Sequence, residues 1–152
     1  MDIDRQLWTG RVDTAEGERA QRWHQQVQPL RTGQAPGVAL LGFACDAGVL
    51  RNQGKVGAAD GPAAIRRMAV DLAWHGSDQV PLIDAGDVVC RGDELEAAQA
   101  ELGERVAALL RAGHLPILLG GGHEIAWGSY QGIAAACGDA LEGYGILNFD
   151  AH

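Results

Sequence analysis

The stretch LPILLGGGHE, residues 115–124, decides the fold class of this chain. Its first half is a short apolar run with the length of a buried β-strand, and three consecutive glycines follow, which let the backbone turn tightly. A helix is then expected from about residue 124 to residue 136. Strand, glycine turn and helix in this order are typical of one unit of a parallel β-sheet.

The same alternation runs through the rest of the chain. Apolar runs at residues 38–43, 80–85 and 145–149 predict three further strands, and a long glycine-rich loop follows the first of them. Alternating strands and helices imply right-handed crossovers. We therefore expect a three-layer α/β/α fold, in which helices cover both faces of a parallel sheet. Ligands bind such sheets beyond the carboxyl ends of the strands.

Two helices are expected between these strands. The first starts at residues 60–62 (DGP), a helix-start signal, and its apolar face comprises Ile65, Met68, Ala69 and Leu72. The second starts at Asp93, whose side chain would form a capping box with Glu96, and it ends at Gly113. The stripe of this second helix comprises Leu95, Ala98, Leu102, Val106 and Leu109.

Length and composition indicate one globular domain, residues 1–152, in which residues 1–36 form a polar extension with a surface helix at residues 14–30. The formal net charge of −8 argues against nucleic acid as a partner. The three cysteines form no disulfide pattern. The sequence shows no signal peptide and no membrane-spanning run, so we expect a cytoplasmic protein.

Three side chains are candidates for a metal site. His123 follows one predicted strand, and Asp150 and His152 follow another. Residues two apart in an extended chain point to the same side, so Asp150 and His152 would project together. If a single crossover helix joins the two strands, all three side chains lie at one edge of the sheet. A carboxylate with two imidazoles suits Mn, Fe, Co or Zn better than Ca or Mg.

Other readings of the polar residues are weaker. The glycine run lacks the dinucleotide-binding pattern, because Ile125 stands where the third glycine belongs, and no P-loop or nucleophile elbow is present. The remaining histidines at positions 24, 75 and 114 are expected to be solvated or to cap helices. Asp87 is expected to anchor a loop by accepting backbone N–H bonds.

Taken together, these motifs resemble the ureohydrolase family, the arginase and agmatinase group. The resemblance is carried by residues 42–48 (GFACDAG) and their continuation to residue 66, by residues 120–123 (GGGH), and by residues 149–152 (FDAH). Arginases and agmatinases usually have Asp and Ser where this chain has Gly122 and Glu124. That difference, and residues 7–11 (LWTGR), make the chain most similar to the formimidoylglutamase branch.

The resemblance implies a two-manganese centre in which His123 binds one ion, His152 binds the other, and Asp150 bridges both. It implies hydrolysis of a small amidine or guanidine substrate through water activated between the metals. A sheet that ends at its middle would expose a strand edge, so we also expect a homo-oligomer, in which another copy covers that edge. The family's three other ligands would lie beyond residue 152. The resemblance therefore implies an arginase-like fold that ends after about half of the sheet, and we expect the 152-residue chain alone to be inactive.

Two alternatives remain open from the sequence. One is an agmatinase or another guanidino-acid ureohydrolase, which would release urea instead of formamide. The other is a non-catalytic truncated remnant that serves as an interaction module.

Overall fold

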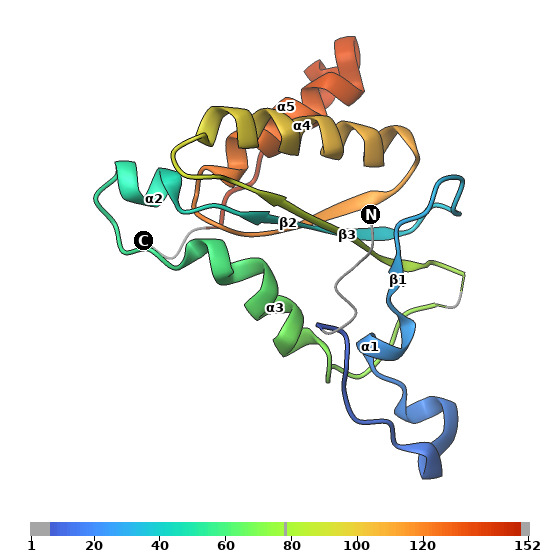
Figure 1. Ribbon diagram of the computed structural model, residues 1–152. Helices are drawn as coiled ribbons and strands as arrows, with labels where there is room; N and C mark the ends of the chain where they lie inside the picture. The colour runs from blue at the N-terminus through green and yellow to red at the C-terminus, as the bar shows by residue number, and fades with distance from the viewer. Residues whose placement is uncertain (1–6, 78, 150–152) are drawn as a thin grey trace.

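A four-stranded parallel sheet forms the centre of the computed structural model, which describes residues 7–77 and 79–149 (Figure 1). β2 (Val38–Ala44) lies between β3 (Leu82–Val89) and β4 (Leu115–Leu119), and the two-residue β1 (Gln28–Pro29) pairs with the outer side of β3. The predicted parallel α/β class is confirmed.

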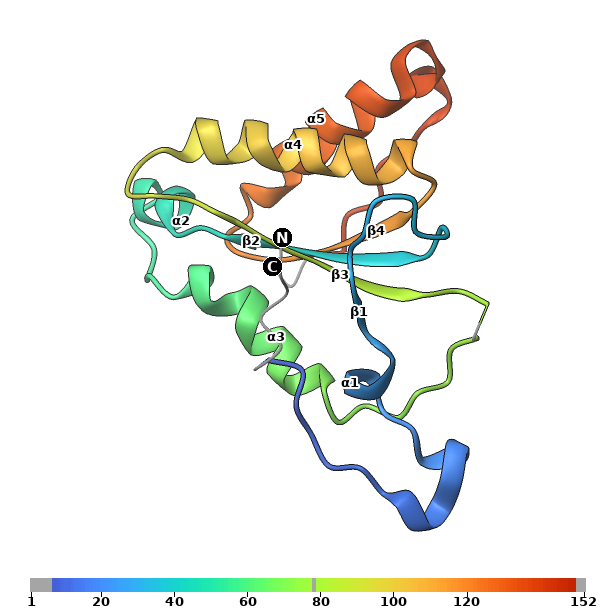
Figure 2. The same ribbon diagram turned by 45° about the vertical axis from the view of Figure 1, so that its right-hand side comes forward.

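Helices cover both faces of this sheet (Figure 2). α4 (Leu95–Arg111) and α5 (Ile125–Cys137) lie on one face, and α3 (Gly61–Ala69) lies on the other. Side chains of β2 alternate accordingly, because successive residues of a strand point to opposite faces. Ala39, Leu41 and Phe43 join the core under α4, whereas Leu40 joins the smaller core that contains Ala69.

The expected stripe of α4 is confirmed, because Leu95, Ala98, Leu102, Val106 and Leu109 are all buried. Gly113 ends the helix with a positive φ of 81°, as predicted. The expected capping box was wrong. No side chain caps α4, and the carboxylates of Asp93 and Glu96 instead bind the guanidinium of Arg51 in α2 (Ala47–Arg51).

The predicted apolar face of α3 was wrong except for Ala69. Ile65, Met68 and Leu72 are exposed, and the buried members of the helix are Pro62, Arg66 and Ala69. The reason is electrostatic. α3 turns Arg66 toward the sheet, where two carboxylates of β3 receive its guanidinium. β3 itself extends to Val89, four residues past the predicted end, and passes through Gly86 at a φ of 76°.

Residues 14–30 do not form the single helix that was expected. They contain the 3-10 helix η1 (Thr14–Ala20), the short helix α1 (Trp23–Gln26) and β1. Gly17, with φ 64° and ψ −152°, interrupts η1. Of the four residues at helical spacing, Ala20 ends η1 and Trp23 starts α1, whereas Val27 and Leu30 lie outside the three elements.

The strand predicted at residues 145–149 does not form. After the 3-10 helix η3 (Gly138–Gly143), residues 144–149 have no regular structure, and Ile146, Leu147 and Phe149 are 81%, 87% and 94% exposed. Residues 144–148 lie along α5, with which they line a cavity of about 910 Å³. An apolar run becomes a strand only where a neighbouring strand can receive its backbone hydrogen bonds. The predicted strand at residues 145–149 was therefore wrong.

Within residues 7–77 and 79–149, no helix has both the length and the apolar character needed to cross a membrane.

Candidate functional site

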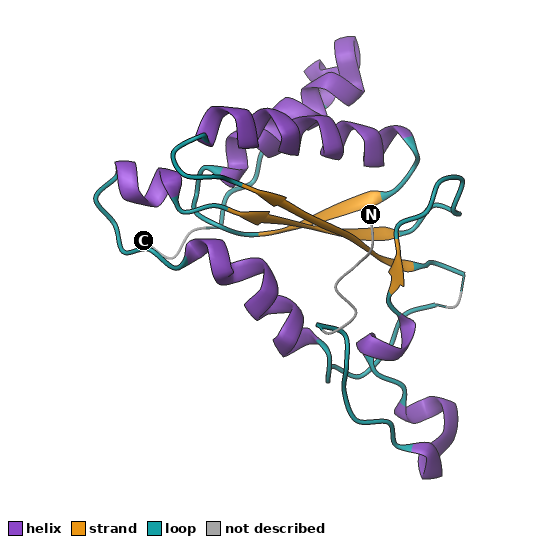
Figure 3. Cartoon of the chain, viewed as in Figure 1, coloured by secondary structure: helices purple, strands orange, loops and turns teal. Residues whose placement is uncertain are grey.

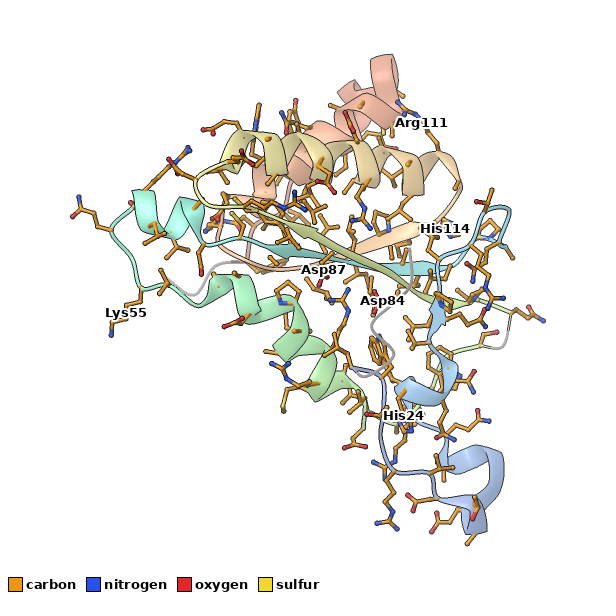
Figure 4. The ribbon with its side chains drawn as sticks, in the orientation of Figure 1. His24, Lys55, Asp84, Asp87, Arg111 and His114 are labelled. Atoms are coloured by element: carbon orange, nitrogen blue, oxygen red, sulfur yellow. The ribbon has the colours of Figure 1, made fainter. Side chains whose placement is uncertain are left out.

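Three loops meet at the carboxyl end of the sheet, where parallel sheets bind ligands (Figure 3). The loop after β2 contains α2 and the 3-10 helix η2 (Ala58–Asp60), a short loop follows β3, and residues 120–124 join β4 to α5. Lys55 projects outward from the first of these loops (Figure 4). The sequence motifs at residues 42–66 and 120–123 therefore lie together at this edge.

The turn after β4 is held closely against the neighbouring backbone. A Cβ atom on Gly121 would lie 2.5 Å from the carbonyl oxygen of Phe43 and 3.2 Å from that of Cys45. Gly61, at the start of α3, approaches the carbonyl oxygen of Gly120 so closely that a Cβ there would lie 2.7 Å from it. These glycines let the turn that carries His123 sit between the end of β2 and the start of α3.

Substitution of Gly121 by alanine should therefore lower the free energy of unfolding by about 1–3 kcal/mol, the usual cost of overpacking. The atoms that the new methyl group meets belong to backbone, which cannot rotate away. Gly120→Ala is the matched control, because a Cβ at that position meets nothing within 4 Å. Denaturant unfolding of the two variants checks this, and equal losses would contradict it.

Asp46 organises the glycine-rich loop after β2. Its Oδ1 accepts hydrogen bonds from the backbone N–H groups of Gly57 and Ala59, at 3.0 and 3.1 Å. The carboxylate therefore closes a loop of about ten residues against the end of β2. The sequence left the role of Asp46 open, although an Asp followed by glycines is a recurrent signal of such turns.

Half-buried Glu124 and buried Cys45 lie next to each other beneath the turn. The Oε1 atom of Glu124 is buried and has no hydrogen-bond partner among the described residues. Burial is the main reason why the pKa of the Cys45 thiol is raised to about 12, and the neighbouring side chains of Cys90 and Glu124 add to this increase. Sequence reasoning missed the position of Glu124, because nothing in the spacing shows that its side chain folds back under the turn.

Cys45 should be the slowest of the three thiols to react with iodoacetamide at pH 8. It is fully buried, whereas Cys90 and Cys137 are partly exposed, and its raised pKa keeps the reactive thiolate scarce. Peptide mass spectrometry after timed alkylation measures this order, and all three should react alike in urea. Early labelling of Cys45 in the folded protein would contradict the structure.

The raised pKa of Cys45 also makes the stability of the fold depend on pH. The unfolded thiol ionises near pH 8.5, well below the folded value of about 12. Its contribution to stability is complete below pH 8.5 and is lost as the pH rises toward 12.

A buried ion-pair network joins α3 to β3 on the face of the sheet that α3 covers. Arg66 donates from Nε and Nη2 to the two carboxylate oxygens of Asp84, each at 2.8 Å, and from Nη1 to Asp87 Oδ1 at 2.7 Å. Trp8 Nε1 also donates to Asp84, at 2.6 Å. Burial alone would lower the pKa of Arg66, but the hydrogen bonds and charges of the two carboxylates raise it overall.

This network corrects one expectation. The carboxylate that accepts a backbone N–H bond is that of Asp84, from Gly86 at 2.8 Å, while Asp87 binds Arg66 instead. Figure 4 shows both aspartates beside the sheet, on the side that faces α3.

The structure places only one of the three candidate metal ligands. His123 is exposed in the turn at the carboxyl end of β4. Asp150 and His152 lie outside the described residues, so the convergence of the three side chains stays a prediction. Among residues 7–77 and 79–149, no group of three or more His, Cys, Asp and Glu side chains could hold a metal ion.

The other histidines lie elsewhere. His24 and His114 are far from the carboxyl end of the sheet in Figure 4. His114 is buried and its Nδ1 accepts the N–H of Gly37 at 3.2 Å, while His24 Nδ1 lies 2.8 Å from the carbonyl oxygen of Val70. Both therefore serve local structure. His75 is exposed.

Comparison with known proteins identifies the family. The Arginase family model matches residues 36–152. The chain belongs to the arginase family. It is 56% identical to the formimidoylglutamase of Chromobacterium violaceum over 150 residues, which cover 99% of this chain and 47% of that protein. It is 51% identical to the formimidoylglutamase of Aeromonas hydrophila, with 99% of this chain and 48% of that protein covered.

Solved structures of this family agree with the fold. A crystal structure of Trypanosoma cruzi formiminoglutamase with Mn²⁺ matches with a TM-score of 0.59 and 30% identity, over 66% of this chain and 36% of that one. The chain spans about half the length of the relatives from Chromobacterium and Aeromonas.

Proposed function

We propose that this chain is part of a manganese-dependent formimidoylglutamase, which hydrolyses N-formimidoyl-L-glutamate to L-glutamate and formamide. The observation that carries the proposal is the 56% identity to a formimidoylglutamase over 99% of the chain. The arrangement at the sheet edge supports it, because the motif Gly122-His123-Glu124 and the loop of Asp46 lie together where parallel sheets bind ligands.

The proposed metal ligands are His123, Asp150 and His152. A neutral imidazole and a carboxylate are donors that suit Mn²⁺, and exposed His123 lies in a turn whose backbone is fixed on both sides. A pair of bound manganese ions would supply the activation of water and the stabilisation of developing negative charge. The chain's own contribution, as far as the described residues go, would be to hold His123 on a short, tightly packed turn, which keeps its imidazole in place.

The test is product analysis with the full-length protein. Incubation with N-formimidoyl-L-glutamate and Mn²⁺ should release formamide and L-glutamate in equal amounts, and chelation should abolish the release. Agmatine, arginine and 4-guanidinobutyrate serve as controls that would yield urea. Urea from any of these, without formamide from the first substrate, would replace the proposal with a guanidino-acid hydrolase. Inactivity on all four, with Mn²⁺ bound, would reject both.

The 152-residue chain by itself is proposed to be inactive. It holds three of the six ligands that the family resemblance implies. The same assay on the isolated chain should therefore show no Mn²⁺-dependent formamide release, and robust turnover would contradict this.

A further inference from the structure

The carboxyl group of Glu124 lies where two glycines, Gly48 and Gly122, have no side chain. A Cβ on Gly122 would lie 2.0 Å from Glu124 Oε2, and a Cβ on Gly48 would lie 2.5 Å from Glu124 Cδ and 2.6 Å from Oε2. At both positions the three nearest atoms all belong to the Glu124 carboxyl group. Gly122 is in the turn beside His123, and Gly48 is in α2, after β2.

The backbone of Glu124 is fixed independently of its side chain. Its carbonyl oxygen accepts a hydrogen bond from Gln99 Nε2 of α4 at 2.9 Å and another from the backbone N–H of Trp127 at 3.2 Å. The side chain therefore starts from a rigid point at the beginning of α5. It extends between the two glycines toward Cys45, and its Oε1 atom is buried.

We infer that Glu124 is a positioning residue that holds the loop after β2 at a set distance from the turn of His123, and that Gly48 and Gly122 are glycines because of it. The inference rests on the proposed function for one of its measurements, the rate of formamide release. It also gives a physical reason for the sequence difference from arginases and agmatinases. An Asp at position 122 would place its Cβ on the Glu124 carboxyl group, so Glu at 124 requires Gly at 122.

The carboxyl group is the far end of a flexible side chain, so a methyl group at either glycine would displace it without unfolding the protein. Gly122→Ala, Gly48→Ala and Glu124→Ala should therefore have the same consequence, which is that no carboxyl group occupies the space between the two loops. Removal of groups that orient metal ligands typically costs 10–100-fold in metal affinity or activity. We expect each variant to weaken Mn²⁺ binding and to lower kcat about tenfold.

A double-mutant cycle in the full-length protein tests the inference. The measurements are Mn²⁺ affinity by EPR titration, kcat with N-formimidoyl-L-glutamate, and the rate of Cys45 alkylation, which reports on the loop without metal or substrate. Gly122→Ala and Gly48→Ala should each change all three quantities when introduced into the wild-type protein. When introduced into Glu124→Ala, neither should change any of these quantities further. Glu124→Gln, which keeps the shape and one acceptor oxygen, should retain most of the activity.

Several outcomes would overturn the inference. Independent, multiplicative effects of Gly122→Ala and Glu124→Ala would show that the glycine does not act through Glu124. Unchanged Cys45 alkylation and Mn²⁺ affinity in Glu124→Ala would show that the carboxyl group positions nothing. If only the proposed function were wrong, the results would differ from these. Cys45 alkylation and Mn²⁺ affinity would still show the expected non-additive effects, but no protein, wild type included, would release formamide.

Discussion

Replacement of Arg66 by methionine should lower the free energy of unfolding by about 3–5 kcal/mol, the range for breaking a buried ion pair by removing one partner. Arg66 is 1% exposed and satisfies both oxygens of Asp84 as well as one of Asp87. Methionine fills a similar volume, so the loss would come mainly from the carboxylate of Asp84. Among residues 7–77 and 79–149, this buried carboxylate would keep Trp8 Nε1 and the Gly86 N–H as its donors.

The matched control for this variant is Arg67→Met. Arg67 is the next residue of α3, it is exposed, and surface substitutions usually stay within about 0.5 kcal/mol. Urea unfolding of both variants, followed by circular dichroism, compares them under the same conditions. A loss below about 1 kcal/mol for Arg66→Met would mean that the network contributes no more than a surface ion pair.

In the full-length protein, His123→Ala should reduce Mn²⁺-dependent formamide release by at least about 100-fold, because loss of a ligand should cost no less than loss of the groups that orient ligands. The proposed ligand contributes directly to the centre that activates water, and no other histidine lies at this turn within the described residues. His123 is exposed, so the substitution should leave the free energy of unfolding of the metal-free protein nearly unchanged.

His75→Ala is the control for the loss of an imidazole, because His75 is also exposed and lies outside the three loops of the site. Metal analysis after dialysis should find fewer manganese ions per chain in His123→Ala and an unchanged number in His75→Ala. Wild-type turnover and manganese content in His123→Ala would reject the proposed ligand set.

The elements that the sequence predicted best are those whose pattern is local. β4 begins and ends where its apolar run does, and α4 buries every member of its predicted stripe. Apolar spacing suffices there because the buried side chains are apolar and need no specific partner. The three consecutive glycines also located the turn before α5. The structure gives the reason for one of them, because a Cβ on Gly121 would lie too close to the backbone of Phe43.

The failures share one physical cause, which is that the structure of a segment depends on partners far away in sequence. Arg66 overturned the predicted face of α3 because its carboxylate partners lie 18 and 21 residues further along the chain. The capping box at α4 was lost because Arg51 binds both of its members. The apolar run at residues 145–149 forms no strand, because a strand depends on a neighbour and not on composition alone.

The sequence by itself determined the kind and order of the central elements, the parallel sheet and the position of His123 at a strand end, because these depend on spacing along one segment. The tertiary structure alone decided which side chains meet: Arg66 with two aspartates, and Glu124 with the space left by Gly48 and Gly122. Such meetings depend on the distance between segments, and that distance is set only when the helices pack on the sheet.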